Sequence, residues 1–167
     1  MLKSKGIAMG LTDIIVIYFK RFLKVSSLLF IILTLLSSKA FAGVTFNDIN
    51  GDGTGFDVSS QDTAPMGLAF NTDGTKMFVV GYTGKDVNEY TLTTGFDLST
   101  ARFNDINGDG TGFDVSSQET QPYGLAFNTD GTKMFVLGYN GDDVNEYTLT
   151  TGFDLSTASF NDINGDG

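Results

Sequence analysis

The feature that most constrains this chain is a 57-residue unit that is present twice and then begins a third time. The segment Phe-Asn-Asp-Ile-Asn-Gly-Asp-Gly starts at Phe46, at Phe103 and at Phe160, so each start lies 57 residues after the one before. Residues 46–102 and 103–159 differ at only seven positions, and two such copies must fold alike. Repeats of this kind bury their apolar faces by stacking, usually in arrays of about three or more. Because the third copy, residues 160–167, is incomplete, we expect further copies in the full protein.

One copy predicts four short antiparallel strands. Residues 67–70 form an apolar strand, and the Asp-Gly pair within residues 71–75 is a strong hairpin signal. Residues 76–82 present two apolar faces, which predicts a strand covered on both sides. Residues 87–92 alternate with polar side chains, which predicts a third strand closer to solvent, and a weaker outer strand is expected near 101–104. The sequence therefore predicts an all-β fold of tandem four-stranded antiparallel blades of a β-propeller, with about two blades present.

The hairpin segment resembles a known repeat family. Residues 67–80 read Gly-Leu-Ala-Phe-Asn-Thr-Asp-Gly-Thr-Lys-Met-Phe-Val-Val, residues 87–92 read Val-Asn-Glu-Tyr-Thr-Leu, and the pattern returns at 124–137 and 144–149. This pattern resembles the blade signature of YVTN-like bacterial β-propeller repeats, and the resemblance implies the propeller fold. Such repeats occur in surface proteins, adhesins and enzymes alike, so the resemblance does not carry an activity with it.

The motif that carries ligand chemistry is the glycine-rich loop at residues 48–57. Oxygen-bearing side chains at the first, third and fifth loop positions, followed by Gly, match the front half of a calcium loop. The loop also resembles the Asp-x-Asn-Gly-Asp-Gly element of FG-GAP and EF-hand repeats, although Ser59 stands where an EF-hand has Glu. The predicted calcium ligands of the two copies are Asp48, Asn50, Asp52, Asp57, Asp105, Asn107, Asp109 and Asp114. An ordinary Asn-Gly and Asp-Gly turn is the alternative, and both interpretations stay open.

The remaining polar and aromatic side chains predict structural roles. Glu89 and Glu146 lie in the middle of the third strand of each copy, where we expect them to face solvent rather than act as general acids. The tyrosines of the strands are expected to pack in the core or between blades rather than to stack on sugars. The sequence therefore predicts no catalytic residue.

Residues 1–42 have the three parts of a secretory signal peptide. A basic cluster at residues 20–24 precedes an apolar run at 25–36, and Ala40-Phe41-Ala42 supplies a small-x-small cleavage site. The run is short for a membrane span of about 20 residues, so we expect cleavage after Ala42, with an uncleaved signal anchor as the alternative. The prediction assigns residues 43–167 to the repeats and places them outside the cell, in the periplasm or on the cell surface.

Composition narrows the range of functions. The chain has no Cys and no His, which excludes disulfides, thiolate metal sites and the commonest general base. Residues 43–167 hold 19 acidic and 4 basic side chains, and such a surface repels nucleic acid and anionic lipid. We therefore expect a protein or glycan ligand of unknown identity, no nucleic acid, and membrane contact only through the signal segment during export.

Three functions fit these observations. The leading hypothesis is a secreted or cell-surface scaffold that binds or supports other molecules without catalysis and is stabilised by calcium. The second is part of an exported propeller enzyme, a hydrolase or a lyase, whose active site lies on other blades; near-identical blades disfavour it, because an asymmetric active site needs blades that differ. The third is a calcium-dependent structural repeat that folds only outside the cell.

Overall fold

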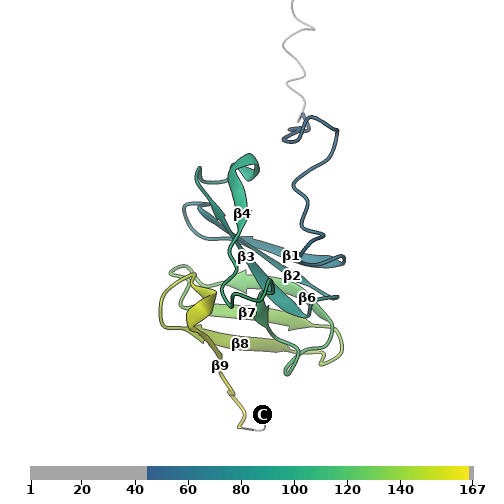
Figure 1. Cartoon of the computed structure of the whole chain (residues 1–167). Helices are drawn as coiled ribbons and strands as arrows, with labels where there is room; N and C mark the ends of the chain where they lie inside the picture. Colours follow the sequence, from purple (N-terminus) through teal and green to yellow (C-terminus); the bar gives the residue numbers. More distant parts are fainter. Residues whose placement is uncertain (1–44, 166–167) are drawn as a thin grey trace, which may run out of the picture. The chain divides into compact units, whose positions relative to one another are not determined.

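The computed structural model describes residues 45–165 (Figure 1), so the predicted signal segment, residues 1–42, lies outside the described residues. The fold is all-β, as predicted, and consists of two antiparallel sheets. The first sheet contains β1 (Pro65–Phe70), β2 (Lys76–Gly81), β3 (Asp86–Leu92), β4 (Ala101–Phe103) and β5 (Phe113–Asp114). The second contains β6 (Pro122–Phe127), β7 (Lys133–Gly138), β8 (Val144–Leu149) and β9 (Ala158–Phe160). Short 3-10 turns, Leu98–Thr100 and Leu155–Thr157, precede β4 and β9.

The two copies fold alike, as their sequences require. In each, four strands pair in sequence order, and the register of every pair in the first copy returns 57 residues later. Each sheet is open, and neither closes into a barrel among the residues described. Within these residues no helix is long and apolar enough to cross a membrane.

The Asp-Gly hairpins form where the sequence predicts them. The Asp73 carboxylate accepts hydrogen bonds from the Thr75 backbone N–H at 3.0 Å and from the Thr75 hydroxyl at 2.6 Å, which closes the turn between β1 and β2. Gly74 has a φ of 72° in this turn, and a Cβ at this position would collide with the Phe96 ring. Glycine is therefore required there for two reasons, its left-handed backbone and the close approach of an aromatic side chain.

The glycine-rich loop of the second copy interrupts the outer strand of the first sheet. β4 pairs with the Tyr90–Leu92 end of β3, and β5 pairs with the Asp86–Val87 end, so both strands lie along one edge of β3. The loop at residues 104–112 bulges out between them. The sequence predicts a glycine-rich loop here, but the β5 pairing, which ties the second copy to the edge of the first sheet, is not visible in the strand pattern.

The main core lies between the two sheets, which stack one over the other (Figure 1). The first sheet contributes the fully buried side chains of Phe78, Val80 and Val87 to this core, and the second sheet contributes Met134 and Val136. A separate cluster around Met77 and Val79 lies on the other face of the first sheet. β2 is therefore covered on both sides, as its two apolar faces predict.

The prediction that residues 87–92 lie closer to solvent is wrong for the first copy. Val87, Asn88, Glu89 and Tyr90 are all at most 1% exposed. β3 has strands on both edges and the second sheet over one face, so its polar alternation does not mark a solvent face. In particular, Glu89 is buried rather than solvated.

Candidate functional site

Each glycine-rich loop is closed by hydrogen bonds from its own backbone. The Asp48 carboxylate accepts from the N–H groups of Gly51 at 2.7 Å, Asp52 at 3.1 Å and Gly53 at 3.0 Å. The Asn50 amide donates to the Gly55 carbonyl at 2.6 Å. These bonds wrap the chain around one carboxylate, and Gly51 and Gly53 supply the positive φ values of 73° and 82° that the turn needs.

The second copy repeats this arrangement. Asp105 accepts from the N–H groups of Gly108 at 2.7 Å and Gly110 at 3.0 Å, and Asn107 donates to the Gly112 carbonyl at 2.9 Å. The Asp109 carboxylate accepts from the Thr111 hydroxyl at 2.7 Å. Hydrogen bonds from the following threonine lower the pKa of Asp109, as they do in the first copy for Asp52.

The predicted calcium ligands do not converge in this conformation. Asp57 and Asp114 each accept a bond of 2.8 Å from the backbone N–H two residues later, as in a local turn. Among residues 45–165, no three or more His, Cys, Asp or Glu side chains come together in a group that could hold a metal ion. The side chains have the oxygen atoms that calcium prefers as ligands, but the described loop is held as a turn by hydrogen bonds from its backbone N–H groups. Calcium binding stays a prediction.

Two buried carboxylates that no sequence motif marks anchor the loops before β3 and β8. Asp62, 2% exposed, accepts from the N–H groups of Ala64 at 2.5 Å and Gly84 at 2.6 Å. Its counterpart Glu119, 1% exposed, accepts from Gln121 at 2.6 Å and Gly141 at 3.0 Å. The only signal for them in the sequence is that the two copies differ at this position, Asp62 against Glu119, and yet both have an acidic side chain there.

Asp86 fixes the end of the glycine-rich loop to the first sheet. Its carboxylate accepts from the Asn88 side chain at 2.8 Å and from the Gly112 N–H at 2.9 Å. Burial raises the pKa of the Asp86 carboxyl, and these two hydrogen bonds oppose that rise. The loop is thus held to the edge of β3 both by the β5 pairing and by this side chain.

A buried ion pair joins the two copies. The ammonium of Lys76 lies 2.7 Å from the Glu89 carboxylate and also donates to the Phe153 carbonyl of the second copy at 2.7 Å. The other oxygen of Glu89 accepts from the Leu155 N–H of the second copy at 3.3 Å. Glu89 is fully buried, and the Asn104 side chain donates to it at 2.8 Å. The pair therefore exchanges hydrogen bonds with two backbone groups of the neighbouring copy.

The equivalent pair in the second copy, Lys133 and Glu146, is more exposed to solvent. Lys133 and Glu146 are 2.6 Å apart, but their side chains are 45% and 17% exposed, against 27% and 0% for Lys76 and Glu89. The Lys133 and Asn161 side chains donate to Glu146 and lower its pKa. The chemistry of the two pairs is identical, and only the covering copy differs.

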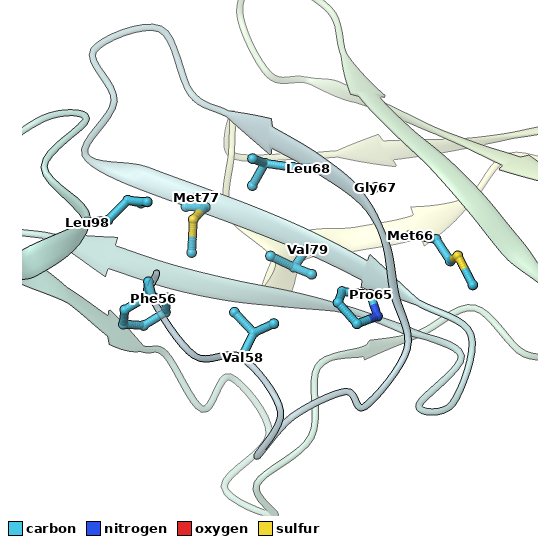
Figure 2. A pocket seen from close by; sticks show the side chains of 9 residues that line it. All are labelled: Phe56, Val58, Pro65, Met66, Gly67, Leu68, Met77, Val79 and Leu98. Carbon is cyan, nitrogen blue, oxygen red and sulfur yellow. The ribbon is translucent and has the colours of Figure 1, made fainter. Parts of the chain in front are cut away.

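An apolar groove of about 320 Å³ lies on the outer face of the first sheet (Figure 2). Figure 2 shows Phe56, Val58, Val79 and Leu98 gathered on that face. Leu68, which also lines the groove, is 57% exposed. With its apolar walls, the groove suits an apolar surface better than a charged small molecule.

No family model matches the chain, and no curated protein matches it.

Proposed function

We propose that the chain is an exported repeat protein of the β-propeller type that serves as a non-enzymatic binding or structural scaffold. One observation carries this proposal. Each of the four buried carboxylates among residues 45–165, which are Asp62, Asp86, Glu89 and Glu119, is hydrogen-bonded to the fold's own groups. Catalytic carboxylates are instead expected in a cleft with groups left free for substrate.

The arrangement of the sheets supports the propeller part of the proposal. Each copy makes a four-stranded antiparallel sheet, and the second stacks face to face on the first. β1 lies beside β6, and a Cβ on Gly67 would come within 3.1 Å of the Leu125 backbone nitrogen. Propeller blades approach one another in this way at their inner strands, and further blades, whether of this chain or of other copies of it, would complete a ring.

Acidity suggests which ligands such a scaffold would take. Residues 43–167 carry 19 acidic and 4 basic side chains, so we propose a protein or glycan ligand and not a nucleic acid. Calcium bound at the glycine-rich loops would offset part of this charge and stiffen the edges of the sheets.

Export is tested by the mass of the chain recovered from a bacterial host that expresses residues 1–167. Cleavage after Ala42 predicts a mature chain that begins at Gly43 and is found outside the cytoplasm. Ala42→Phe is the control, since a large side chain at this position blocks signal peptidase. An uncleaved wild-type chain retained in the inner membrane would refute the proposed export.

The absence of catalysis is tested with chromogenic glycosides, esters and phosphoesters and with uronate polymers, whose cleavage by a lyase creates an absorbing double bond. We expect no turnover by the purified chain. The critical variant is Glu146→Gln, because Glu146 is the more exposed of the two equivalent strand carboxylates. Turnover by the wild type that this variant loses would establish an enzyme instead.

A further inference from the structure

We propose that two faces that residues 45–165 leave uncovered bind each other, so that chains of residues 1–167 assemble head to tail. The first is the open face of the second sheet, made by Phe135, Leu137 and Val144 with the Lys133–Glu146 pair. The second is the groove of the first sheet shown in Figure 2. The occupant of each is a second copy of this chain. This inference rests on the scaffold function proposed above and names one partner of the scaffold.

The contact between the two sheets within one chain supplies the template. Phe78, Val80 and Val87 of the first sheet are 0% exposed because the second copy covers them. The Phe78 ring lies 4.6 Å from the Phe127 ring and 6.3 Å from the Phe153 ring, measured between centroids. This face of one copy is thus fully buried by the opposite face of the next.

No residue among 45–165 covers the same face of the second copy. Leu137, the counterpart of Val80, is 49% exposed, and Val144, the counterpart of Val87, is 54% exposed. Together with the half-buried Phe135, these side chains present the apolar surface that is buried in the first copy. A contiguous apolar patch of this kind, bordered by charged groups, marks an interaction surface.

The groove is the matching half. Val58, Leu68, Phe96 and Leu98 of the first copy correspond to Val115, Leu125, Phe153 and Leu155 of the second, which cover the first sheet. Leu68 and Phe96 are 57% and 61% exposed, whereas their counterparts are half-buried. The chain therefore carries both halves of one interface at opposite ends of its two-sheet stack.

The sequence differences between the copies leave this complementarity intact. Of the seven differing positions, Val80/Leu137 lies within the buried contact, and there one aliphatic side chain replaces another. Met66 and Tyr123 differ beside it, but both remain exposed, at 40% and 47%. A docked copy would therefore meet nearly the same side chains that already pack within the chain.

Backbone pairing and charge give the docking its register. Inside the chain, β5 pairs Phe113 with Val87 and Asp114 with Asp86. Among the described residues no strand pairs in this way with Asp143 and with Val144, the first residue of β8. Phe56 and Asp57 of a second copy have the sequence of β5 and would fill that edge. The same docking would bring its Phe96 carbonyl and Leu98 N–H to the Lys133–Glu146 pair, as Phe153 and Leu155 serve Lys76 and Glu89.

Because the two faces differ, the contact is heterologous, and it forms either a closed ring or an open series of chains. The test uses the full chain, purified from whichever cell fraction holds it, in light scattering or sedimentation velocity across a wide concentration range. The wild type is expected to form species larger than one chain. Leu68→Lys places a charge in the apolar groove, and Leu137→Lys places one on the open face. Each variant alone is expected to stay monomeric, because every possible contact then includes one disrupted face.

The decisive sample is the mixture of these two variants. Each retains one intact face, so the mixture is expected to form a one-to-one dimer and nothing larger. Tyr139→Lys is the matched control, because Tyr139 is 63% exposed and its counterpart Tyr82 is still 42% exposed in the covered copy. This control is expected to assemble as the wild type does. A monomeric wild type, a single-face variant that still dimerises, or a mixture that stays monomeric would overturn the proposal.

A second measurement keeps the proposal testable if a lysine variant does not fold. The chain has no native cysteine, so Asp57→Cys and Asp143→Cys can be placed on separate chains. By analogy with the Asp86–Asp114 pair, these cysteines would face each other across the new strand pair, within the span of a disulfide. The mixture should cross-link under mild oxidation, whereas Asp57→Cys mixed with Tyr139→Cys should not. Equal cross-linking in both mixtures would overturn the register and the proposal with it. Export plays no part in either experiment, so failed export and failed assembly are distinguishable.

Discussion

Lys76→Met and Lys133→Met remove the lysine of each ion pair in turn. They test whether the contribution of a pair to the free energy of unfolding depends on the copy that covers it rather than on the local sequence. Lys76→Met keeps most of the apolar stem but leaves the Glu89 carboxylate fully buried without its cation. Removal of one partner from a buried pair costs about 3–5 kcal/mol. Since the Lys76 side chain is itself 27% exposed, water solvates part of its ammonium and weakens the pair. We therefore expect Lys76→Met to lower the free energy of unfolding by about 2–3 kcal/mol. Lys133→Met, in the exposed pair, should cost less than about 1 kcal/mol.

The measurement is the free energy of unfolding from urea titrations followed by circular dichroism and tyrosine fluorescence. Both variants are made in the Leu68→Lys background, so that self-association does not cover Lys133. The expected difference of about 2 kcal/mol corresponds to a factor of about 30 in the unfolding equilibrium. Adding Glu89→Gln to Lys76→Met should recover part of the loss, because a neutral amide costs less to bury unpaired than a carboxylate. Equal losses for Lys76→Met and Lys133→Met would refute the reasoning.

Three further predictions concern pH, backbone strain and calcium. Burial raises the pKa of Tyr90 to about 12. The contribution of Tyr90 to the free energy of unfolding is therefore complete below about pH 10, the ordinary tyrosine pKa, and is lost as the pH rises from about 10 to about 12. Tyr90→Phe, which loses only a hydroxyl hydrogen bond, should be about 1 kcal/mol less stable than the wild type at pH 8 and more stable near pH 12; parallel curves would count against this. Phe96 and Phe153 both have positive φ, 61° and 58°, but Phe96→Gly should change unfolding free energy by less than about 1 kcal/mol, whereas Phe153→Gly should cost about 2 kcal/mol or more through lost packing on Phe78. Calcium in excess should raise the melting temperature by about 5 °C or more, and Asp48→Asn combined with Asp105→Asn should abolish the rise; an unchanged wild-type melting temperature would leave the loops as plain turns.

The sequence by itself determined the strands and turns, because these depend on local chemistry. Alternating apolar residues place β1 and β2, and the Asp-Gly pairs place the hairpins, since Asp73 caps its own turn and Gly74 takes the left-handed backbone. The near-identical repeat also required two sheets of the same register, which the structure confirms. The glycine-rich loops could be located because their closure is local, with Asp48 accepting from Gly51 and Gly53. The β5 pairing beside them could not, since it joins segments far apart in the chain.

Only the tertiary structure decided which face of each sheet is covered. Glu89 and Glu146 lie in the same local sequence, Val-Asn-Glu-Tyr-Thr-Leu, and this window of neighbouring residues cannot distinguish them. One is fully buried and the other is not, because the second copy lies over the first and no described residue lies in the same position over the second. Burial is a property of what packs on a residue and not of the residue's own neighbours in sequence. For that reason the repeat predicted identical strands, while the difference between its two ends became visible only in the packed structure.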